Sequence, residues 1–155
     1  MSETDFMTRA IQLSAENLAM NGGPFGAVVV RQGKIIGEGA NRVVPTSDPT
    51  AHAEIVAIRA ACQTVQSHAL EGATIYTTCE PCPMCLSAIW WARISQIVYG
   101  NSREDAALIG FDDDEIYKEV SRPFAARKLP VRRFMAAEAG EIFAAWLNKT
   151  DRVPY

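Results

Sequence analysis

The stretch TIYTTCEPCPMCLSAIWWARISQIVYG, residues 74–100, decides the fold of this 155-residue chain. Its β-branched and aromatic beginning, Thr74 to Thr78, is typical of a strand, and so is its end, Gln96 to Gly100. Cys82 to Ala92 lies between them and has the pattern of a helix, with Pro81 at its entrance. A strand, a helix and a strand in this order predict a right-handed crossover between two parallel strands.

The segments before this stretch extend the same unit. Residues 4–20 carry apolar side chains at three- and four-residue steps, which predicts an amphipathic helix. Ala27 to Arg31 and Lys34 to Glu38 predict a hairpin that turns at Gln32-Gly33. His52 to Val65 has one apolar face and predicts a second helix.

The pattern is weaker after residue 100. Helical periodicity is faint from Asp105 to Val120, Val131 to Met135 predicts a last strand, and Glu138 to Trp146 predicts a last helix. No internal repeat or linker interrupts the chain. We therefore expect one α/β domain over residues 1–155, with helices on both faces of a five-stranded mixed sheet.

Composition limits the functions that this chain can have. Its 48% hydrophobic and 21% charged residues are typical of a globular protein. The net charge of -3 argues against a broad nucleic-acid surface, although Arg122, Arg127, Lys128, Arg132 and Arg133 form a local basic exception. Neither a signal peptide nor a membrane-spanning run is present, so we expect a cytoplasmic protein with no membrane partner. In that compartment the four cysteines are expected to be free or bound to metal.

Two short motifs carry the candidate chemistry. His52-Ala53-Glu54 opens the second predicted helix, and Pro81-Cys82-Pro83-Met84-Cys85 opens the third. Cysteines three residues apart on a helix lie on one face and can bind one metal ion. A histidine at the start of a neighbouring helix would add a third ligand. Three protein ligands leave the fourth zinc position to water, as in a catalytic site.

Glu54 can turn such a metal site into a reaction centre. At the first turn of a helix its carboxylate can lie beside the bound water, take its proton and return it to a substrate. An alternative is a closed structural zinc, because Cys79 with His52, Cys82 and Cys85 would supply four ligands and leave Glu54 without a role. The same closed four-ligand site would be expected in a non-catalytic binding module that zinc stabilises.

The pair H-x-E and P-C-x-x-C resembles the signature of the zinc nucleobase and nucleoside deaminases. The resemblance covers about Pro24 to Gly100. It implies one catalytic Zn²⁺ held by His52, Cys82 and Cys85, with Glu54 moving protons. It also implies a three-layer α/β/α fold of the cytidine-deaminase kind.

Further segments are similar to those of bacterial guanine deaminases within that family. They are residues 22–27, 48–54, 110–113 and 116–119, and they extend the similarity along nearly the whole chain. This resemblance implies zinc-dependent hydrolysis of guanine to xanthine and ammonia. It also implies a homodimer that exchanges its C-terminal segment, from about residue 137 to 155.

The resemblance implies a set of contacts with a small purine base. Asn41 and Asp113 would form hydrogen bonds with it, Phe25 would pack near it, and the tail ending in Tyr155 would close the pocket. The remaining predicted contacts are Ala53, within the metal motif, and Trp91, as a pocket wall. An acidic residue suits guanine because the ring amide and the amino group present donors on one edge.

Two other deaminases would share this metal site. A tRNA adenosine deaminase needs a large basic surface, and the last predicted helix carries two acidic residues instead. Cytosine deamination differs only in the pocket contacts. The sequence therefore leaves the substrate to be decided among these bases.

Overall fold

The computed structural model describes all residues, 1–155, and divides the chain into two units, Met1–Asp113 and Asp114–Tyr155. The first unit contains a sheet with its helices, and the second contains helices without a strand. No helix in either unit is long and apolar enough to cross a membrane. The motifs between residues 52 and 85 therefore lie entirely in the first unit.

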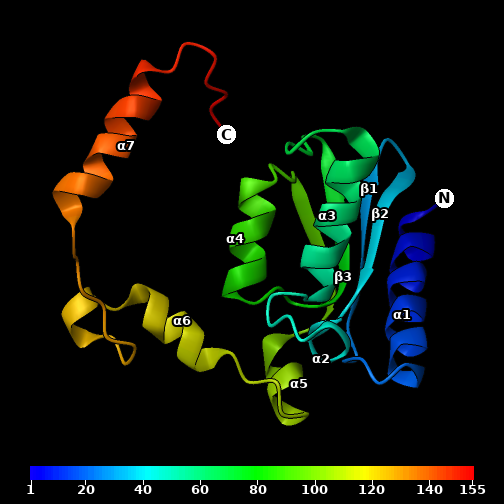
Figure 1. The fold of residues 1–155 in the computed structure, drawn as a ribbon. Helices are drawn as coiled ribbons and strands as arrows, with labels where there is room; N and C mark the ends of the chain where they lie inside the picture. The colour runs from blue at the N-terminus through cyan, green and yellow to red at the C-terminus, as the bar shows by residue number, and fades with distance from the viewer. The chain divides into compact units, whose positions relative to one another are not determined.

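A four-stranded mixed sheet runs through the first unit (Figure 1). Its strands are β1 (Gly26–Arg31), β2 (Lys34–Ala40), β3 (Ala73–Cys79) and β4 (Gln96–Asn101), in the spatial order β2-β1-β3-β4. Strand β1 is antiparallel to β2 and β3, whereas β3 and β4 are parallel. Gln32 and Gly33 both have positive φ, 52° and 71°, as a tight two-residue hairpin turn requires. The predicted hairpin and the parallel pair are thus confirmed.

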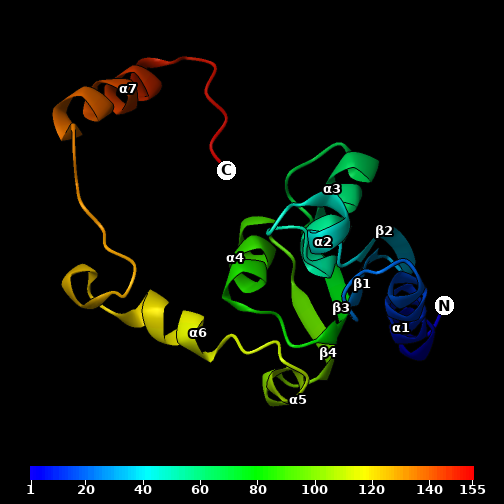
Figure 2. The same cartoon turned by 60° about the horizontal axis from the view of Figure 1, so that its bottom comes forward.

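Helices cover both faces of this sheet, as predicted (Figure 2). Helix α1 (Glu3–Ala19) lies on one face, in a core made of Phe6, Ala10, Val28, Val30 and Tyr76. Helices α3 (Ala53–Val65) and α4 (Pro83–Trp91) lie on the other, in a core that includes Ala27, Val29, Ala57, Ile75 and Ile89. Successive residues of β1 enter different cores because strand side chains alternate between the faces.

Helix α3 packs unusually close to β2. A Cβ atom built on Gly39 would lie 2.3 Å from the carbonyl oxygen of Ala53, and one on Gly37 would lie 2.4 Å from that of Ala57. Only glycine fits where two backbones approach this closely. The contact sets the position of the first turn of α3, which carries the His52-Ala53-Glu54 motif.

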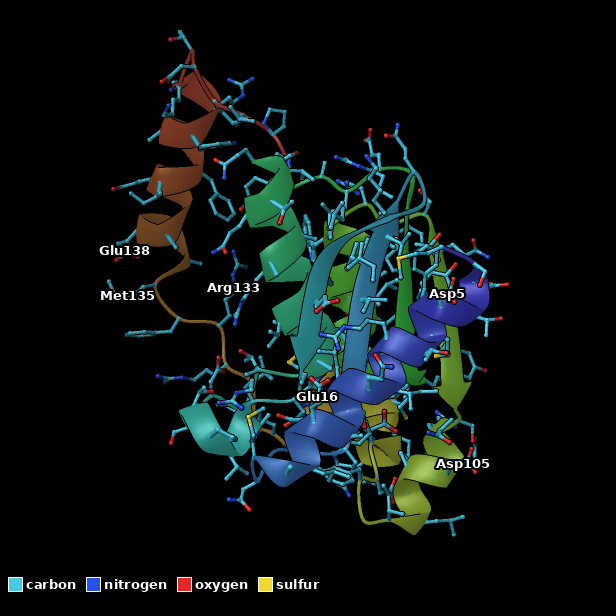
Figure 3. All side chains as sticks on the ribbon, turned by 90° about the vertical axis from the view of Figure 1, so that its right-hand side faces the viewer. Asp5, Glu16, Asp105, Arg133, Met135 and Glu138 are labelled. Atoms are coloured by element: carbon cyan, nitrogen blue, oxygen red, sulfur yellow. The ribbon has the colours of Figure 1, made fainter.

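Helix α1 is tied down at its start and along its length. Ser2 and Asp5 form a capping box, in which each side chain accepts a hydrogen bond from the other's backbone N–H. Asp5 is labelled in the first turn of α1 in Figure 3. Arg9 donates from Nε and Nη2 to the two carboxylate oxygens of Glu38 on β2, at 2.9 and 2.8 Å. This bidentate pair attaches the helix to the edge strand.

The prediction of a fifth strand at Val131 to Met135 was wrong. That segment belongs to the second unit and has no regular secondary structure; Arg133 and Met135 mark it in Figure 3. Val131 and Phe134 are 47% and 70% exposed. A strand forms only where a neighbour satisfies its backbone and packs its side chains, so a strand-like composition without such a neighbour remains irregular.

Short helices make up the rest of both units. The first unit also contains α2 (Val43–Thr46) and α5 (Arg103–Leu108). The second contains α6 (Asp114–Ser121), the 3-10 helix η1 (Phe124–Ala126) and α7 (Ala136–Asn148). Helix α7 contains the predicted last helix, and α5 and α6 account for the faint periodicity between residues 105 and 120.

Candidate metal and active site

The metal motif begins at two helix starts. His52 is the N-cap of α3 and Cys82 is the N-cap of α4, both with extended backbone, and Pro83 follows Cys82 in the first helical position. Proline suits that position because its missing N–H would be unbonded there in any case. Cys85 lies one turn into α4 and is fully buried. The positive ends of two helix dipoles are therefore directed to the region where thiolates are needed.

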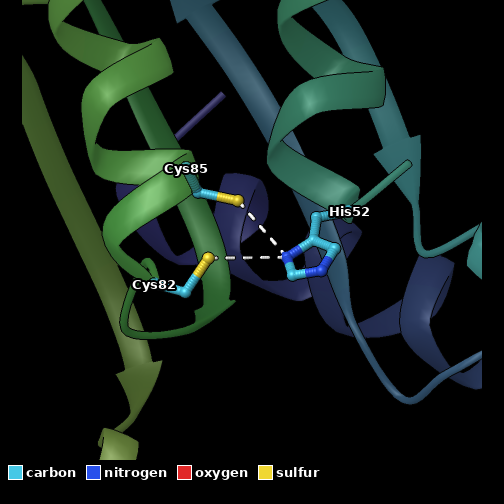
Figure 4. Close-up of side chains that lie close together, drawn as sticks. All are labelled: His52, Cys82 and Cys85. Carbon is cyan, nitrogen blue, oxygen red and sulfur yellow. Dashed lines mark hydrogen bonds between the residues drawn. The ribbon is translucent and has the colours of Figure 1, made fainter. Parts of the chain in front are cut away.

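His52, Cys82 and Cys85 bring their ligand atoms together (Figure 4). The Nδ1 atom of His52 lies 3.6 Å from the Sγ atom of Cys82 and 3.5 Å from that of Cys85. Zinc bonds of about 2.0–2.1 Å to nitrogen and 2.3 Å to sulfur, meeting at the tetrahedral angle, put the two atoms about 3.5 Å apart. These distances suit one Zn²⁺ held by the three side chains.

The charges at this group also suit a cation. Hydrogen bonds from Cys85 and with His52 lower the pKa of Cys82 to about 4. The contact with Cys82 raises the pKa of Cys85, and the hydrogen bond with Cys82 raises that of His52. A cysteine whose thiolate form is favoured at neutral pH suits a divalent cation, because a metal ion binds the deprotonated thiol.

Glu54 lies beside the three ligands but is not one of them. Its side chain is 6% exposed, and its Oε2 atom accepts a hydrogen bond from the Cys85 thiol at 3.5 Å. Burial raises the pKa of this carboxyl group. A raised pKa makes a carboxyl group better able to accept a proton, as an acid-base group must.

Cys79 stays outside the metal group, so the closed four-ligand site does not form. The Cys79 thiol donates to the backbone oxygen of Ser102 at 3.7 Å, and burial raises its pKa to about 11. The thiol is therefore engaged away from the group, and only His52, Cys82 and Cys85 bring their ligand atoms together. Three ligands and an adjacent carboxyl group are what the structure supplies.

Phe25 and Asn41 lie together at the end of the β1–β2 hairpin. The backbone N–H of Asn41 donates to the carbonyl oxygen of Phe25 at 3.0 Å, and the Asn41 side chain is nearly buried, at 7% exposure. Its Oδ1 atom accepts from the backbone N–H of Val43 at 3.3 Å, which leaves the amide NH₂ to donate elsewhere. The Phe25 ring meets Phe111 edge to face, with centroids 4.9 Å apart.

A pocket of about 300 Å³ opens beside Phe25. Its lining consists of Pro24, Phe25, Cys79, Asn101, Asp105, Ala106 and Ile109. Phe25 is the one predicted substrate contact that lines it. The carboxyl ends of β3 and β4 form one wall, where binding sites of α/β sheets are commonly found.

The other predicted contacts have different surroundings. Ala53 is fully buried under β2, and Asp113 is partly buried, with its pKa raised by burial and by the negative charge of Cys82. Trp91 lies at the end of α4 that is far from the metal ligands and is 61% exposed. Tyr155 belongs to the second unit. The roles of all six residues in binding the base stay predictions.

The sequence analysis missed Asn17. This residue is fully buried on α1, and its Nδ2 atom donates to the backbone oxygens of Gly23 and Asn41. The sequence nevertheless indicates that Asn17 is buried. Phe6, Ala10, Leu13 and Asn17 follow one another at steps of four, three and four residues, which places them on one helix face. A polar residue on the buried face of a helix needs partners in the fold.

Comparisons with known proteins agree with this geometry. A family model described as "Cytidine and deoxycytidylate deaminase zinc-binding region" matches residues 1–101. Guanine deaminase of Bacillus subtilis (strain 168) is 46% identical over 156 residues, which covers 100% of both chains. The X-ray structure of guanine deaminase from Bacillus subtilis superimposes with a TM-score of 0.96 at 45% identity, covering 100% of this chain and 99% of that one.

A second kind of relative matches less of the chain. The tRNA-specific adenosine deaminase of Haemophilus influenzae is 42% identical over 113 residues, which are 69% of this chain and 65% of that protein. Similarity to the guanine deaminase thus includes the C-terminal unit in full, whereas similarity to the tRNA deaminase covers about two thirds of the chain.

Proposed function

This chain belongs to the family of the cytidine and deoxycytidylate deaminase zinc-binding region, and from this premise we propose that it hydrolyses guanine to xanthine and ammonia. It is a zinc-dependent deaminase, with His52, Cys82 and Cys85 as the zinc-binding group. The observation that carries the choice of guanine is the similarity to guanine deaminase over the entire chain. The reaction is a step of purine breakdown.

The reaction consumes one water molecule. When bound, zinc lowers the pKa of water to about 7 and so supplies a hydroxide nucleophile near neutral pH. Oxygen bonds to carbon 2 of guanine, the bond from that carbon to the amino group breaks, and the amino group leaves as ammonia. Guanine and water are thereby converted into xanthine and ammonia, with no oxidant or further cofactor.

Glu54 performs the proton transfers in this proposal. Its carboxylate takes one proton from the attacking water and passes it to the ring nitrogen next to carbon 2. It then takes the second proton, from the hydroxyl group now on carbon 2, and delivers it to the amino group, which leaves as ammonia while the carbonyl group forms. Burial supports this role because it raises the pKa of Glu54 and brings it closer to neutral pH. The contact of Glu54 with Cys85 supports a position next to the metal ligands.

Six residues are proposed to select the base. Asp113 accepts from the ring amide and amino donors, and the Asn41 amide donates to an acceptor on another edge. Ala53 adds its backbone N–H, which lies in the first turn of α3, where such groups have no helical partner. Phe25 packs on the ring, and Trp91 and Tyr155 complete the walls of the pocket.

The proposed enzyme is a cytoplasmic homodimer whose subunits exchange the segment from about residue 137. Free cysteines support a reducing compartment. The apolar side chains of α7 support the exchange: Ile142, Phe143, Trp146 and Leu147 are 70%, 77%, 43% and 66% exposed. A helix with this much exposed apolar surface gains stability by covering it, and exchange with a second copy would cover it.

A substrate panel tests the proposal. The zinc-loaded protein is assayed for ammonia release from guanine, adenine, cytosine, guanosine and a tRNA hairpin that contains adenosine. We expect the highest kcat/KM with guanine. A higher kcat/KM with the hairpin or with cytosine would overturn the choice of substrate, and no release from any of the five would overturn the assignment as a nucleobase deaminase.

A further inference from the structure

Asn17 is a fully buried polar residue that the proposed mechanism does not use. It lies in the last turn of α1, on the face that Phe6 and Ala10 occupy nearer the start. Its Oδ1 atom is buried without a hydrogen-bond partner. An unpaired buried acceptor is unfavourable, so an apolar residue would serve helix packing better at this position.

The Asn17 amide joins two loops that are distant in sequence. Its Nδ2 atom donates to the backbone oxygen of Gly23 at 2.8 Å and to that of Asn41 at 2.7 Å. Backbone hydrogen bonds close the network: Phe25 donates to Gly23 at 2.8 Å, and Asn41 donates to Phe25 at 3.0 Å. One side chain thus holds the turn before β1 and the residue after β2.

The turn before β1 is packed closely against Asn17 and Asn41. A Cβ atom built on Gly22 would lie 2.1 Å from Asn17 Nδ2, and one on Gly23 would lie 3.1 Å from Asn41 Cγ. Gly22 is thus packed against the Asn17 amide, Gly23 is packed against Asn41, and the amide is hydrogen-bonded to both loops. The side chains held in this way, Phe25 and Asn41, are two of the proposed contacts with the base.

We infer that Asn17 is a positioning residue of the base pocket, which holds Phe25 and Asn41 in the arrangement that binds a planar purine. The inference rests on the proposed function and adds a residue on α1, which carries none of the proposed contacts. Asn17 acts through Asn41 and Phe25. It does not touch the metal ligands, so its loss should weaken base binding and leave zinc and proton transfer intact.

The test uses Asn17→Asp, which keeps the shape and removes the amide donors. We expect KM for guanine to rise about tenfold, as the loss of net hydrogen-bond energy predicts. We expect kcat within about twofold and one zinc per chain. Asn17→Ala, which removes the side chain without adding charge, should change KM in the same direction. Phe6→Leu is the control, because it disturbs α1 packing at Tyr76 and leaves both loops alone.

A coupling measurement excludes a purely structural role. Residues that act through one another have non-additive effects, so Asn17→Asp should raise KM by less than about threefold in an Asn41→Ala background. Equal KM changes in Asn17→Asp and Phe6→Leu, or fully multiplicative effects with Asn41→Ala, would overturn the inference.

Hydrogen exchange separates this inference from the proposed function. In the zinc-loaded protein, Asn17→Asp should speed amide exchange in residues 22–26 and 41–44 more than Phe6→Leu does. Unchanged exchange in these segments would overturn the inference even if guanine is the substrate. If the unmodified chain does not turn over guanine, the proposed function fails, and the exchange result still decides whether Asn17 holds the two loops.

Discussion

Glu54 and Asp113 are two carboxyl groups near the metal ligands, and burial raises the pKa of each. They differ in their contacts. Glu54 is almost completely buried and bonds to the Cys85 thiol, whereas Asp113 is partly exposed and interacts with Cys82 through its charge. These differences favour the proposed roles, proton transfer for Glu54 and base recognition for Asp113. Each assignment is a statement about one side chain and can be tested by one substitution.

Glu54→Gln should retain zinc and lose catalysis. The amide keeps the size of the side chain but cannot accept a proton, and a positioned acid-base group is typically worth about 10²–10⁴ in rate. We expect kcat for ammonia release to fall by at least about that factor, with zinc measured by mass spectrometry at one ion per chain. Glu71→Gln, an exposed control, should behave as the unmodified protein. Full turnover by a zinc-loaded Glu54→Gln protein would disprove the role.

At the scale of secondary structure, the site depends on the contact between α3 and β2. The backbone of Gly39 touches the backbone of Ala53, which lies between His52 and Glu54. A shift of this helix start would move a metal ligand and the acid-base group together. The glycines of β2 are therefore part of the site, although they lie outside the motif.

Gly39→Ala should destabilise the fold and loosen the metal. The new Cβ would lie 2.3 Å from the Ala53 oxygen, and overpacking of this kind costs about 1–3 kcal/mol. Urea unfolding should show this loss, and a chelator should remove zinc faster. In the control Gly140→Ala, the added Cβ meets nothing within 4 Å. Equal stability of Gly39→Ala and the unmodified protein would show that α3 can shift freely.

The Arg9–Glu38 pair makes the attachment of α1 to β2 dependent on pH. The hydrogen bonds from Arg9 lower the pKa of Glu38. A lowered native pKa means that the pair contributes stability above the ordinary carboxyl value of 4.5, and this contribution is lost as the pH falls through the native value. The side chains are 30% and 37% exposed, so the contribution is that of a partly screened pair.

Glu38→Gln should therefore lower the free energy of unfolding by about 0.5–1 kcal/mol at pH 7. The difference from the unmodified protein should shrink as the pH falls below 4.5. Glu16→Gln is the matched control, because Glu16 contacts the same arginine at 3.3 Å from a more exposed position and should cost less. Urea unfolding across this pH range measures both. A constant difference at all pH values would contradict the linkage.

At the scale of the whole molecule, the proposal assigns Tyr155 of a partner subunit to the base pocket. The metal ligands lie in Met1–Asp113, and Tyr155 ends the second unit. If α7 and the tail are exchanged, Tyr155 of one subunit completes the pocket of the other. The assembly, and not the single chain, would then be the catalytic unit.

Complementation between two defective variants tests the exchange. Glu54→Gln lacks the acid-base group, and removal of Val153 to Tyr155 should weaken guanine turnover without changing zinc content. Unfolding the two together and refolding them should restore about a quarter of the unmodified activity, because half of a random mixture is heterodimer and each heterodimer has one intact site. If the tail closes the pocket of its own chain, the refolded mixture should be no more active than the two variants measured separately.

The sequence by itself determined the features that depend on near neighbours. Cys82 and Cys85 share a helix face because they are one turn apart, and the Gln32-Gly33 turn follows from residues that accept positive φ. Helix α7 was likewise predictable from its periodicity. The metal group became recognisable once the His52-Ala53-Glu54 motif was joined to these cysteines as a family signature.

Only the tertiary structure decided which distant segments meet. It excluded Cys79 from the metal group by giving its thiol to Ser102, and it left Val131 to Met135 without the neighbour that a fifth strand requires. It also placed Asn17 against Gly23 and Asn41, a contact that no local pattern describes. The physical reason is that periodicity and turn preferences act over a few residues, whereas burial and hydrogen bonding depend on how the whole chain packs.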